Sequence, residues 1–286
     1  MKKQYHYLVA GLPELLLDEG RLKTTPAALK SDFGSALQSA DLDLLNVLFL
    51  QHDNANLLNL LEKTEAGFDD RGNFSQELLE EQIRNQDGSL PEYMNRFIAD
   101  YKENQRDKSE MLWETLLEEY YYAYGMQMEN EFLAKWFTYQ FNKRALVTAL
   151  ISRKYELIAE NHLPGDQGIS NQLLRSNARD FGISGEFPEV EKVLQAFENE
   201  NLLAREKALD RVDWEWIDEN TFFNYFTIEK ILGFFLQFML ADRWMKLDEN
   251  EGRRLFGELL EKLDQGYELP GEFSVAGIQQ KKREVE

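Results

Sequence analysis

The fold is decided by residues 113–139, WETLLEEYYYAYGMQMENEFLAKWFTY, in which apolar and aromatic side chains recur every three or four positions. This spacing places them on one face of an α-helix. The side chains on that face are Trp113, Leu117, Tyr120, Tyr124, Met128, Phe132, Trp136 and Tyr139. We therefore expect one long helix from about Ser109 to about Ala159. About fifty residues would extend about 75 Å, longer than a domain of this size is wide, so we expect a kink near Gly125 or a helix that leaves the globule.

The composition of the 286-residue chain favours a folded, all-α protein that does not bind nucleic acid. Its 52 acidic and 32 basic residues give a net charge of −20, which repels phosphate backbones and anionic lipids. With 43% apolar residues, the chain is too hydrophobic for a disordered acidic polypeptide. Few windows alternate as strands do, and the absence of cysteine excludes thiol chemistry and disulfides.

Local signals predict where several helices begin. Thr25 followed by Pro26, and also Ser75 and Thr227, are typical N-caps. Phe187-Pro188 is expected to open a short helix whose inward residues are Val190, Val193, Leu194 and Phe197. Asp248 and Glu251 have the spacing of a capping box, and Gly266 is a suitable end for the helix that would follow.

We expect residues 1–273 to form one helical unit, a bundle or funnel, with sub-bundles at 1–108, 109–176 and 177–273. A repeated unit is suggested because Phe49, Asn54 and Leu58 recur 88 residues later, as Phe137, Asn142 and Leu146. Residues 274–286 have little apolar surface to bury and are expected to fray as a charged tail.

No stretch predicts a membrane span or a secretory signal. The most apolar window, Ile231–Ala241, is well short of the roughly 20 residues that a spanning helix needs. The apolar stretch before Pro13 is short and interrupted, which is a poor match to a signal peptide. We therefore expect a cytoplasmic protein.

A metal-dependent hydrolase is the alternative in which the chain would be an enzyme. His52-Asp53 invites comparison with the His-Asp pair of metal phosphohydrolases, and His6 and His162 could supply further ligands. The following Asn54-Ala55-Asn56 lacks the usual continuation of that family, and a capping or solvated histidine also explains His52. No phosphate-binding glycine loop or nucleophile elbow is present. We therefore expect no catalytic residue, metal or cofactor.

Residues 132–155 contain five bases and no acid, although the chain as a whole is acidic. One interpretation is that these bases favour the C-terminal end of a helix dipole and neutralise acidic neighbours. The other is a docking patch for an acidic partner, with two aromatic side chains supplying apolar contact. The candidate interface residues of this patch are Lys135, Trp136, Tyr139, Lys143, Arg144, Arg153 and Lys154.

Four segments together resemble a bacterial family of unassigned function that is encoded beside V-type ATP synthase subunits. They are Tyr5–Pro13, Leu48–Leu58, Asn177–Gly182 and Leu240–Trp244. Two helical patterns, Asp53 to Leu58 and Asn142 to Lys154, also look like the Asp-x-x-Asn and Arg-x-Lys helices of the C-type subunits of V-type ATPases, known as d-type subunits in eukaryotes. These likenesses add Asn54, Asn56, Asn142, Arg243 and Trp244 to the candidate interface residues.

The resemblance implies a function as well as a fold. The C-type subunits are all-helical funnels of three similar sub-bundles, and they seat the rotor shaft on the proteolipid ring without doing chemistry. We therefore expect a non-enzymatic subunit whose partners are other V-type ATP synthase subunits. It would lie at the inner face of the membrane through protein contacts, with no direct insertion. An acidic helical adaptor unrelated to ATPases is the remaining alternative.

Overall fold

The computed structural model describes residues 3–17, 24–103, 113–157, 163 and 168–246. Within these residues the fold is all-helical, as predicted, with twelve helices and no strand. The helices are α1 (His6–Ala10), α2 (Pro26–Gly34), α3 (Ser39–Val47), α4 (Leu50–Glu62), α5 (Gln76–Arg84), α6 (Glu92–Glu103), α7 (Trp113–Met126), α8 (Glu131–Tyr155), α9 (Ser170–Arg175), α10 (Val190–Phe197), α11 (Leu202–Thr221) and α12 (Ile228–Lys246).

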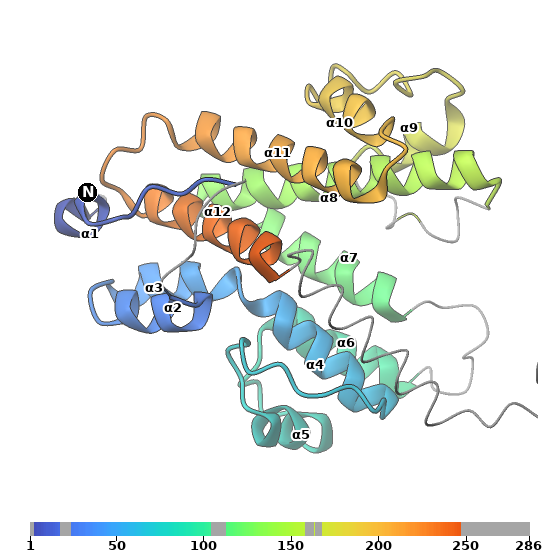
Figure 1. Ribbon diagram of the computed structural model, residues 1–286. Helices are drawn as coiled ribbons and strands as arrows, with labels where there is room; N and C mark the ends of the chain where they lie inside the picture. Colours follow the sequence, from blue (N-terminus) through green and yellow to red (C-terminus); the bar gives the residue numbers. More distant parts are fainter. Residues whose placement is uncertain (1–2, 18–23, 104–112, 158–162, 164–167, 247–286) are drawn as a thin grey trace, which may run out of the picture.

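The helices form a bundle in which α8, α11 and α12 make one layer and α2 to α6 lie to one side of it (Figure 1). α8 packs against α7, α9 and α10, while α11 packs against α10 and α12. α7 also packs against α4 and α6, so it joins the two parts. The buried apolar side chains form one continuous core. The finer expectation of a funnel of three sub-bundles stays a prediction.

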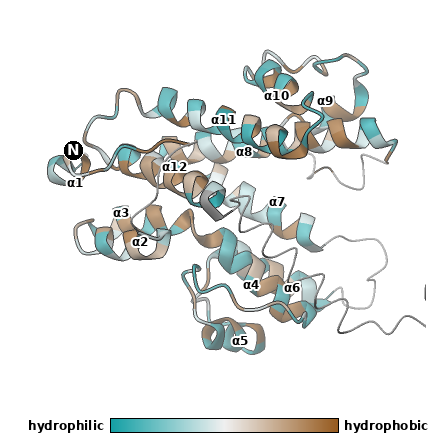
Figure 2. Cartoon of the chain, in the orientation of Figure 1, coloured by the Kyte–Doolittle hydropathy of each residue, from teal (hydrophilic) through white to brown (hydrophobic). Residues whose placement is uncertain are grey.

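α12 lies at the centre of this core. Apart from Gln237, which donates to Asp218 of α11, its stretch from Ile231 to Ala241 is apolar, as expected for a helix enclosed by others (Figure 2). The ring of Phe235 lies 5.2 Å from that of Phe33 in α2 and 6.4 Å from that of Phe49 at the start of α4. The most apolar window of the sequence is therefore a buried core helix. No helix in the described ranges is long and apolar enough to cross a membrane.

The predicted helix over 109–159 is wrong in one respect, because its described part is two helices, α7 and α8. Asn130 ends the interruption as the N-cap of α8, and its side chain accepts a hydrogen bond from the amide of Leu133. The interruption begins after Met126, close to the kink expected near Gly125, which itself lies in the last turn of α7. A Cβ at this position would lie 2.1 Å from Cγ of Phe137, so glycine allows α7 and α8 to approach closely.

Contacts between α7 and α8 show that the chain turns back on itself. Along α7, Gly125 meets Phe137, the ring of Tyr122 lies 5.7 Å from that of Phe141, and Glu118 pairs with Arg144. Residues earlier in α7 contact residues later in α8, so the two helices run antiparallel. The aromatic stripe faces the neighbouring helices, with Trp113 on Tyr101 of α6 and Tyr139 on Trp216 of α11, so it is mostly core.

Several predicted helix starts are confirmed. Thr25 caps α2 with Pro26 at its first position, and Ser75 caps α5 through the amide of Leu78. Thr227 directly precedes α12. α10 follows Phe187-Pro188 and buries Val190, Val193, Leu194 and Phe197. The predicted capping box at Asp248 and Glu251, the stop at Gly266, the tail 274–286 and His162 lie outside the described residues.

Candidate interhelical site

Three acids on α11 point to the helices on either side of it. Glu206, Asp210 and Asp213 are spaced by four and three residues, which places them on one face of α11. Asp213 pairs with α8, and the other two pair with α12. We call the group Tyr139, Lys143, Asp210, Asp213, Arg243 and Trp244 the interhelical site.

On the α8 side of the interhelical site, two residues one turn apart hold the same carboxylate. Nζ of Lys143 lies 2.5 Å from both carboxylate oxygens of Asp213, and the hydroxyl of Tyr139 donates to Oδ1 at 2.7 Å. Tyr139 and Asp213 are both buried. Burial raises the pKa of the Tyr139 phenol far above its usual value, and the charge of Asp213 raises it further. The phenol therefore keeps its proton and donates it in the hydrogen bond to Asp213.

On the α12 side, Asp210 accepts a hydrogen bond from Nε1 of Trp244 at 2.7 Å. Nη1 of Arg243 lies 3.5 Å from Oδ1 of Asp210, and Nη2 donates to Glu206 at 2.8 Å. Burial raises the pKa of Asp210, and the positive charge of Arg243 opposes that rise. Arg243 and Trp244 thus fix the end of α12 to α11.

Aromatic rings extend the α8–α11 contact beyond the charges. The ring of Trp216, on α11, stacks on that of Tyr139 at 4.9 Å and 19°, and lies 5.4 Å from that of Trp136. Trp136 and Tyr139, predicted as docking aromatics, therefore pack mainly within the chain. Sequence reasoning did not identify their partners Asp213 and Trp216, nor Asp210, the partner of Trp244, although the spacing of the acids on α11 was a usable signal.

A cavity of about 290 Å³ lies between these helices. Its walls include the charged residues Lys143, Asp210, Asp213 and Arg243, together with side chains from α4, α7 and α12. Each of these four charges already has a partner of opposite sign. The arrangement can therefore join helices by shared ion pairs.

Most other residues of the predicted basic patch are also engaged inside the chain. Arg144 pairs with Glu118 at 2.5 Å, and Lys135 lies 3.9 Å from Glu131. Arg153 donates to the carbonyls of Ser176 and Ala178 and stacks its guanidinium 3.8 Å from the centre of the Phe181 ring. The interpretation that these bases neutralise acidic neighbours thus fits Lys143 and Arg144, whereas Arg153 is held by carbonyls and a ring.

Lys154 and Asn142 differ from the rest of the patch. Lys154 is exposed, near the rings of Tyr155 and Phe197. Asn142 is 6% exposed and lines a second cavity, of about 350 Å³, with Lys135 and Tyr139. Among the described residues, its Oδ1 is buried without a hydrogen-bond partner.

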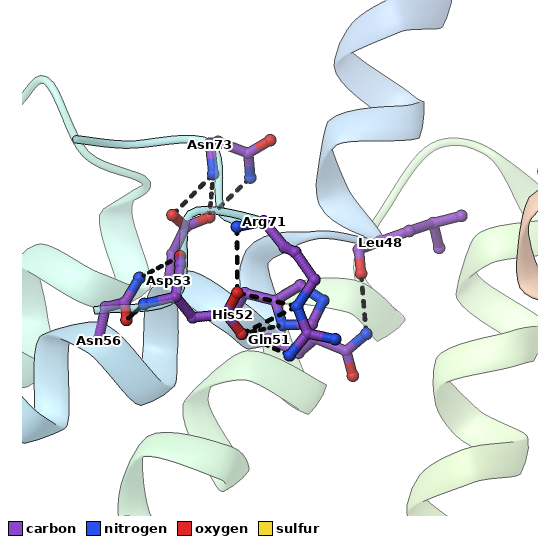
Figure 3. Close-up of polar contacts among 8 residues, drawn as sticks. Leu48, Gln51, His52, Asp53, Asn56, Arg71 and Asn73 are labelled. Carbon is purple, nitrogen blue, oxygen red and sulfur yellow. Dashed lines mark hydrogen bonds and ion pairs between the residues drawn. The ribbon is translucent and has the colours of Figure 1, made fainter. Parts of the chain in front are cut away.

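The Asp-x-x-Asn pattern of α4 clamps the loop that precedes α5 (Figure 3). The Asp53 carboxylate accepts from the amides of Asn73 and Phe74 and from Nδ2 of Asn73, at 2.7 to 3.0 Å. The Asn56 amide exchanges two hydrogen bonds with the backbone of Asp69. A Cβ at Gly72 would lie 2.2 Å from Oδ1 of Asp53, so glycine is needed for this approach.

The three described residues of the metal-site alternative, His6, His52 and Asp53, each have other neighbours. Nδ1 of His52 lies 2.9 Å from Asp69, which also binds Arg71, while Asp53 holds the loop (Figure 3). His6 is exposed beside the ring of Phe226. Within the described ranges, no group of three or more histidine, aspartate or glutamate side chains is placed to hold a metal ion.

Asn54 and Asn56, predicted as interface residues, are both buried. Asn54 accepts a hydrogen bond from the hydroxyl of Tyr93 at 2.7 Å. The sequence of α4 does not indicate these partners, because they lie up to 39 residues away in the chain. Both asparagines are therefore internal contacts between α4 and its neighbours.

Comparison with known proteins identifies one family. A family model described as "Protein of unknown function (DUF2764)" matches residues 1–267, so the chain belongs to this family. A search of curated proteins and a search of solved structures each gave no match.

Proposed function

We propose that this member of the DUF2764 family is a non-enzymatic connector subunit of a V-type ATP synthase, similar to the central-stalk part that couples the rotor shaft to the proteolipid ring. The sequence resemblance to ATPase-linked proteins supports this proposal. Three of the segments on which the resemblance depends, 48–58, 142–154 and 240–244, contribute walls of the central cavity. These three segments therefore meet around one cavity between α4, α8 and α12.

The observation that carries the proposal is where the exposed apolar side chains lie. Among the described residues, all the large exposed apolar side chains except Leu16 fall into two groups. The first group, the aromatic tip, consists of Tyr7, Phe222, Phe223, Tyr225 and Phe226. The second group, the far end, consists of Ile151, Tyr155, Leu157, Leu174, Leu202 and Leu203.

α11 separates these two groups. The helix begins at Leu202, in the far end, and finishes at Thr221, directly before the aromatic tip (Figure 1). Twenty helical residues extend roughly 30 Å, so the groups cannot form one patch. Two separate apolar surfaces are typical of a part that binds something at each end.

The body between the two groups is suited to carrying force. α11 is joined to α8 by the buried Lys143–Asp213 pair and by stacked rings, so separating these two helices would leave a buried charge unpaired. It is joined to α12 by Arg243, which is partly exposed and pairs with Asp210 and Glu206. A rotor connector must transmit torque without its helices sliding, and these cross-links oppose sliding. The exposed leucines of the far end are the surface that we assign to the shaft.

Recovery of the tagged chain from its native host in mild detergent tests the proposal. We expect V-type ATP synthase subunits to be recovered with the wild-type chain and to be depleted with a Leu202→Ser/Leu203→Ser variant, because these side chains are 67% and 58% exposed. Recovery of no ATP synthase subunit would contradict the proposal. Recovery of one unrelated partner instead would favour the adaptor function.

A further inference from the structure

The turn between α11 and α12 carries an unusual stretch of sequence. Residues 220–228, NTFFNYFTI, have no charged side chain in a chain of which 29% is charged. Phe222, Phe223 and Tyr225 are 64%, 80% and 62% exposed, and Phe226 is 37% exposed. Tyr7, in the short helix α1, is 97% exposed. These rings form the aromatic tip.

Contacts around the aromatic tip hold its backbone in place. The amide of Tyr5 donates to the carbonyl of Phe226 at 2.6 Å, and the ring of His6 lies 4.3 Å from that of Phe226. The amide of Asn224 donates to the carbonyl of Thr221 at 3.0 Å. α1 and the turn are therefore one unit, and the rings need no reorganisation to present their faces.

The acids on either side of the aromatic tip do not give it a negative surface. Glu229 is 2% exposed and accepts hydrogen bonds from Asn130 and Thr227. Glu219 is exposed and lies 3.4 Å from Nζ of Lys192, which also pairs with Glu215. The rings of the aromatic tip are thus an uncharged apolar surface with one partly neutralised acid, Glu219, at its edge, whereas the chain as a whole is strongly acidic.

We propose that the aromatic tip inserts its rings into the headgroup region of a lipid bilayer whose surface is electrically neutral. Aromatic rings, and tyrosine in particular, favour the membrane–water boundary because they have an apolar body and a polar edge. A neutral lipid surface matches the neutral aromatic tip, and an anionic surface repels a chain of net charge −20. The inference is independent of the ATP synthase proposal, and it replaces the sequence-based expectation of no direct insertion.

The exposed area favours a bilayer over a second copy of the chain. A fully exposed aromatic side chain presents about 200 Å², so the five exposed fractions leave roughly 700 Å² uncovered. This area exceeds the largest apolar patch of a typical monomer, about 300–600 Å². It would reach the roughly 600–1,000 Å² per partner of a standard protein–protein interface only if every ring were fully covered. A helix-to-helix turn also projects outward, and two such turns cannot cover each other completely.

Vesicle flotation with the purified full-length chain tests the proposal. We expect the wild type to float with vesicles of pure phosphatidylcholine, and to float less as anionic phosphatidylglycerol is added. A Phe222→Ser/Phe223→Ser variant is expected to lose at least about tenfold in partitioning, because two of the inserted rings are removed. The matched control is Leu202→Ser/Leu203→Ser, whose side chains are similarly exposed at the far end and should leave flotation unchanged.

Four results would overturn the inference. They are no flotation of the wild type, equal loss in both double variants, flotation that rises with anionic lipid, and a wild-type dimer that the Phe222→Ser/Phe223→Ser variant abolishes. Light scattering on the eluting protein measures the last of these. None of these measurements uses an ATP synthase component, so their failure and the failure of the proposed function can be told apart.

Discussion

Single carboxylates decide whether loops of this protein keep their shape, and Asp53 shows this most clearly. It is fully buried, and three N–H groups of Asn73 and Phe74 point at its two oxygens. We predict that Asp53→Ala lowers the free energy of unfolding by about 2–4 kcal/mol, because the buried donors lose their acceptor. Urea unfolding measures this. Asp70→Ala, an exposed acid in the same loop, should change it by less than about 0.5 kcal/mol. Equal effects would contradict the clamp.

Buried phenols should make the fold sensitive to alkaline pH. Burial raises the pKa of Tyr122 to about 12, and the nearby Arg144 only partly opposes this rise. Because the folded state keeps the proton longer than the unfolded state, stability is fully present below pH 10 and is lost as pH rises from 10 to about 12. Between pH 10 and about 12 the wild type should lose roughly 3 kcal/mol more free energy of unfolding than Tyr122→Phe, and urea unfolding across this pH range measures the difference. The exposed Tyr155→Phe is the control. Identical pH profiles for wild type and Tyr122→Phe would count against this account.

At the scale of elements, the hairpin of α7 and α8 depends on one glycine. We predict that Gly125→Ala destabilises the protein by about 1–3 kcal/mol, because the new methyl group overlaps the buried ring of Phe137. Gly34→Ala is the matched control, since Gly34 also lies in a helix but its added Cβ would be 3.9 Å from Leu42. Thermal unfolding compares the two. A Gly125→Ala variant at least as stable as the wild type would show that the helices do not approach as described.

The joint between α8 and α11 can be tested by a double-mutant cycle. Lys143→Met should cost about 3–5 kcal/mol, because Asp213 keeps a buried charge without its cation. Adding Asp213→Asn should restore part of that stability, since an amide oxygen still accepts from Tyr139. The exposed pair Arg84 and Glu80 gives the reference cycle, with a coupling energy of at most about 0.5 kcal/mol. Strictly additive costs at Lys143 and Asp213 would contradict a shared ion pair.

The helical class and several helix starts could be predicted because they depend on local chemistry. Thr25 and Ser75 bond to amides three residues away, and such signals are visible in sequence. A kink was expected near Gly125, but the complete break before Asn130 was not, because the apolar spacing continues from α7 into α8. The stripe side chains of the two helices have different partners: Trp113 packs on Tyr101 of α6, and Tyr139 packs on Trp216 of α11. The capping asparagine was the available signal. The partner of Lys143 could not be found in this way, because Asp213 lies 70 residues away.

At the scale of the whole molecule, most of the predicted docking residues and the exposed apolar surface lie in different places. Charged and aromatic residues such as Lys143 and Trp136 looked like docking residues because sequence does not show which charges are already paired. The aromatic tip was not among the predicted interface residues, although the charge-free run around Phe223 can be read in the sequence, and only the fold showed that it lies at one end of α11. We propose that the surface this chain offers to partners is mostly the apolar surface at its two ends, while Lys143 is held inside by the buried pair with Asp213.

Photo-crosslinking in the native host tests this view of a two-ended connector most directly. A photoreactive side chain would replace Leu203 at the far end, Phe223 at the aromatic tip, or the exposed Thr138 in the middle of α8. We predict that position 203 crosslinks to a V-type ATP synthase subunit, that position 223 gives a different product, and that position 138 gives little. The same product at all three positions, or no ATP synthase subunit at position 203, would contradict the account.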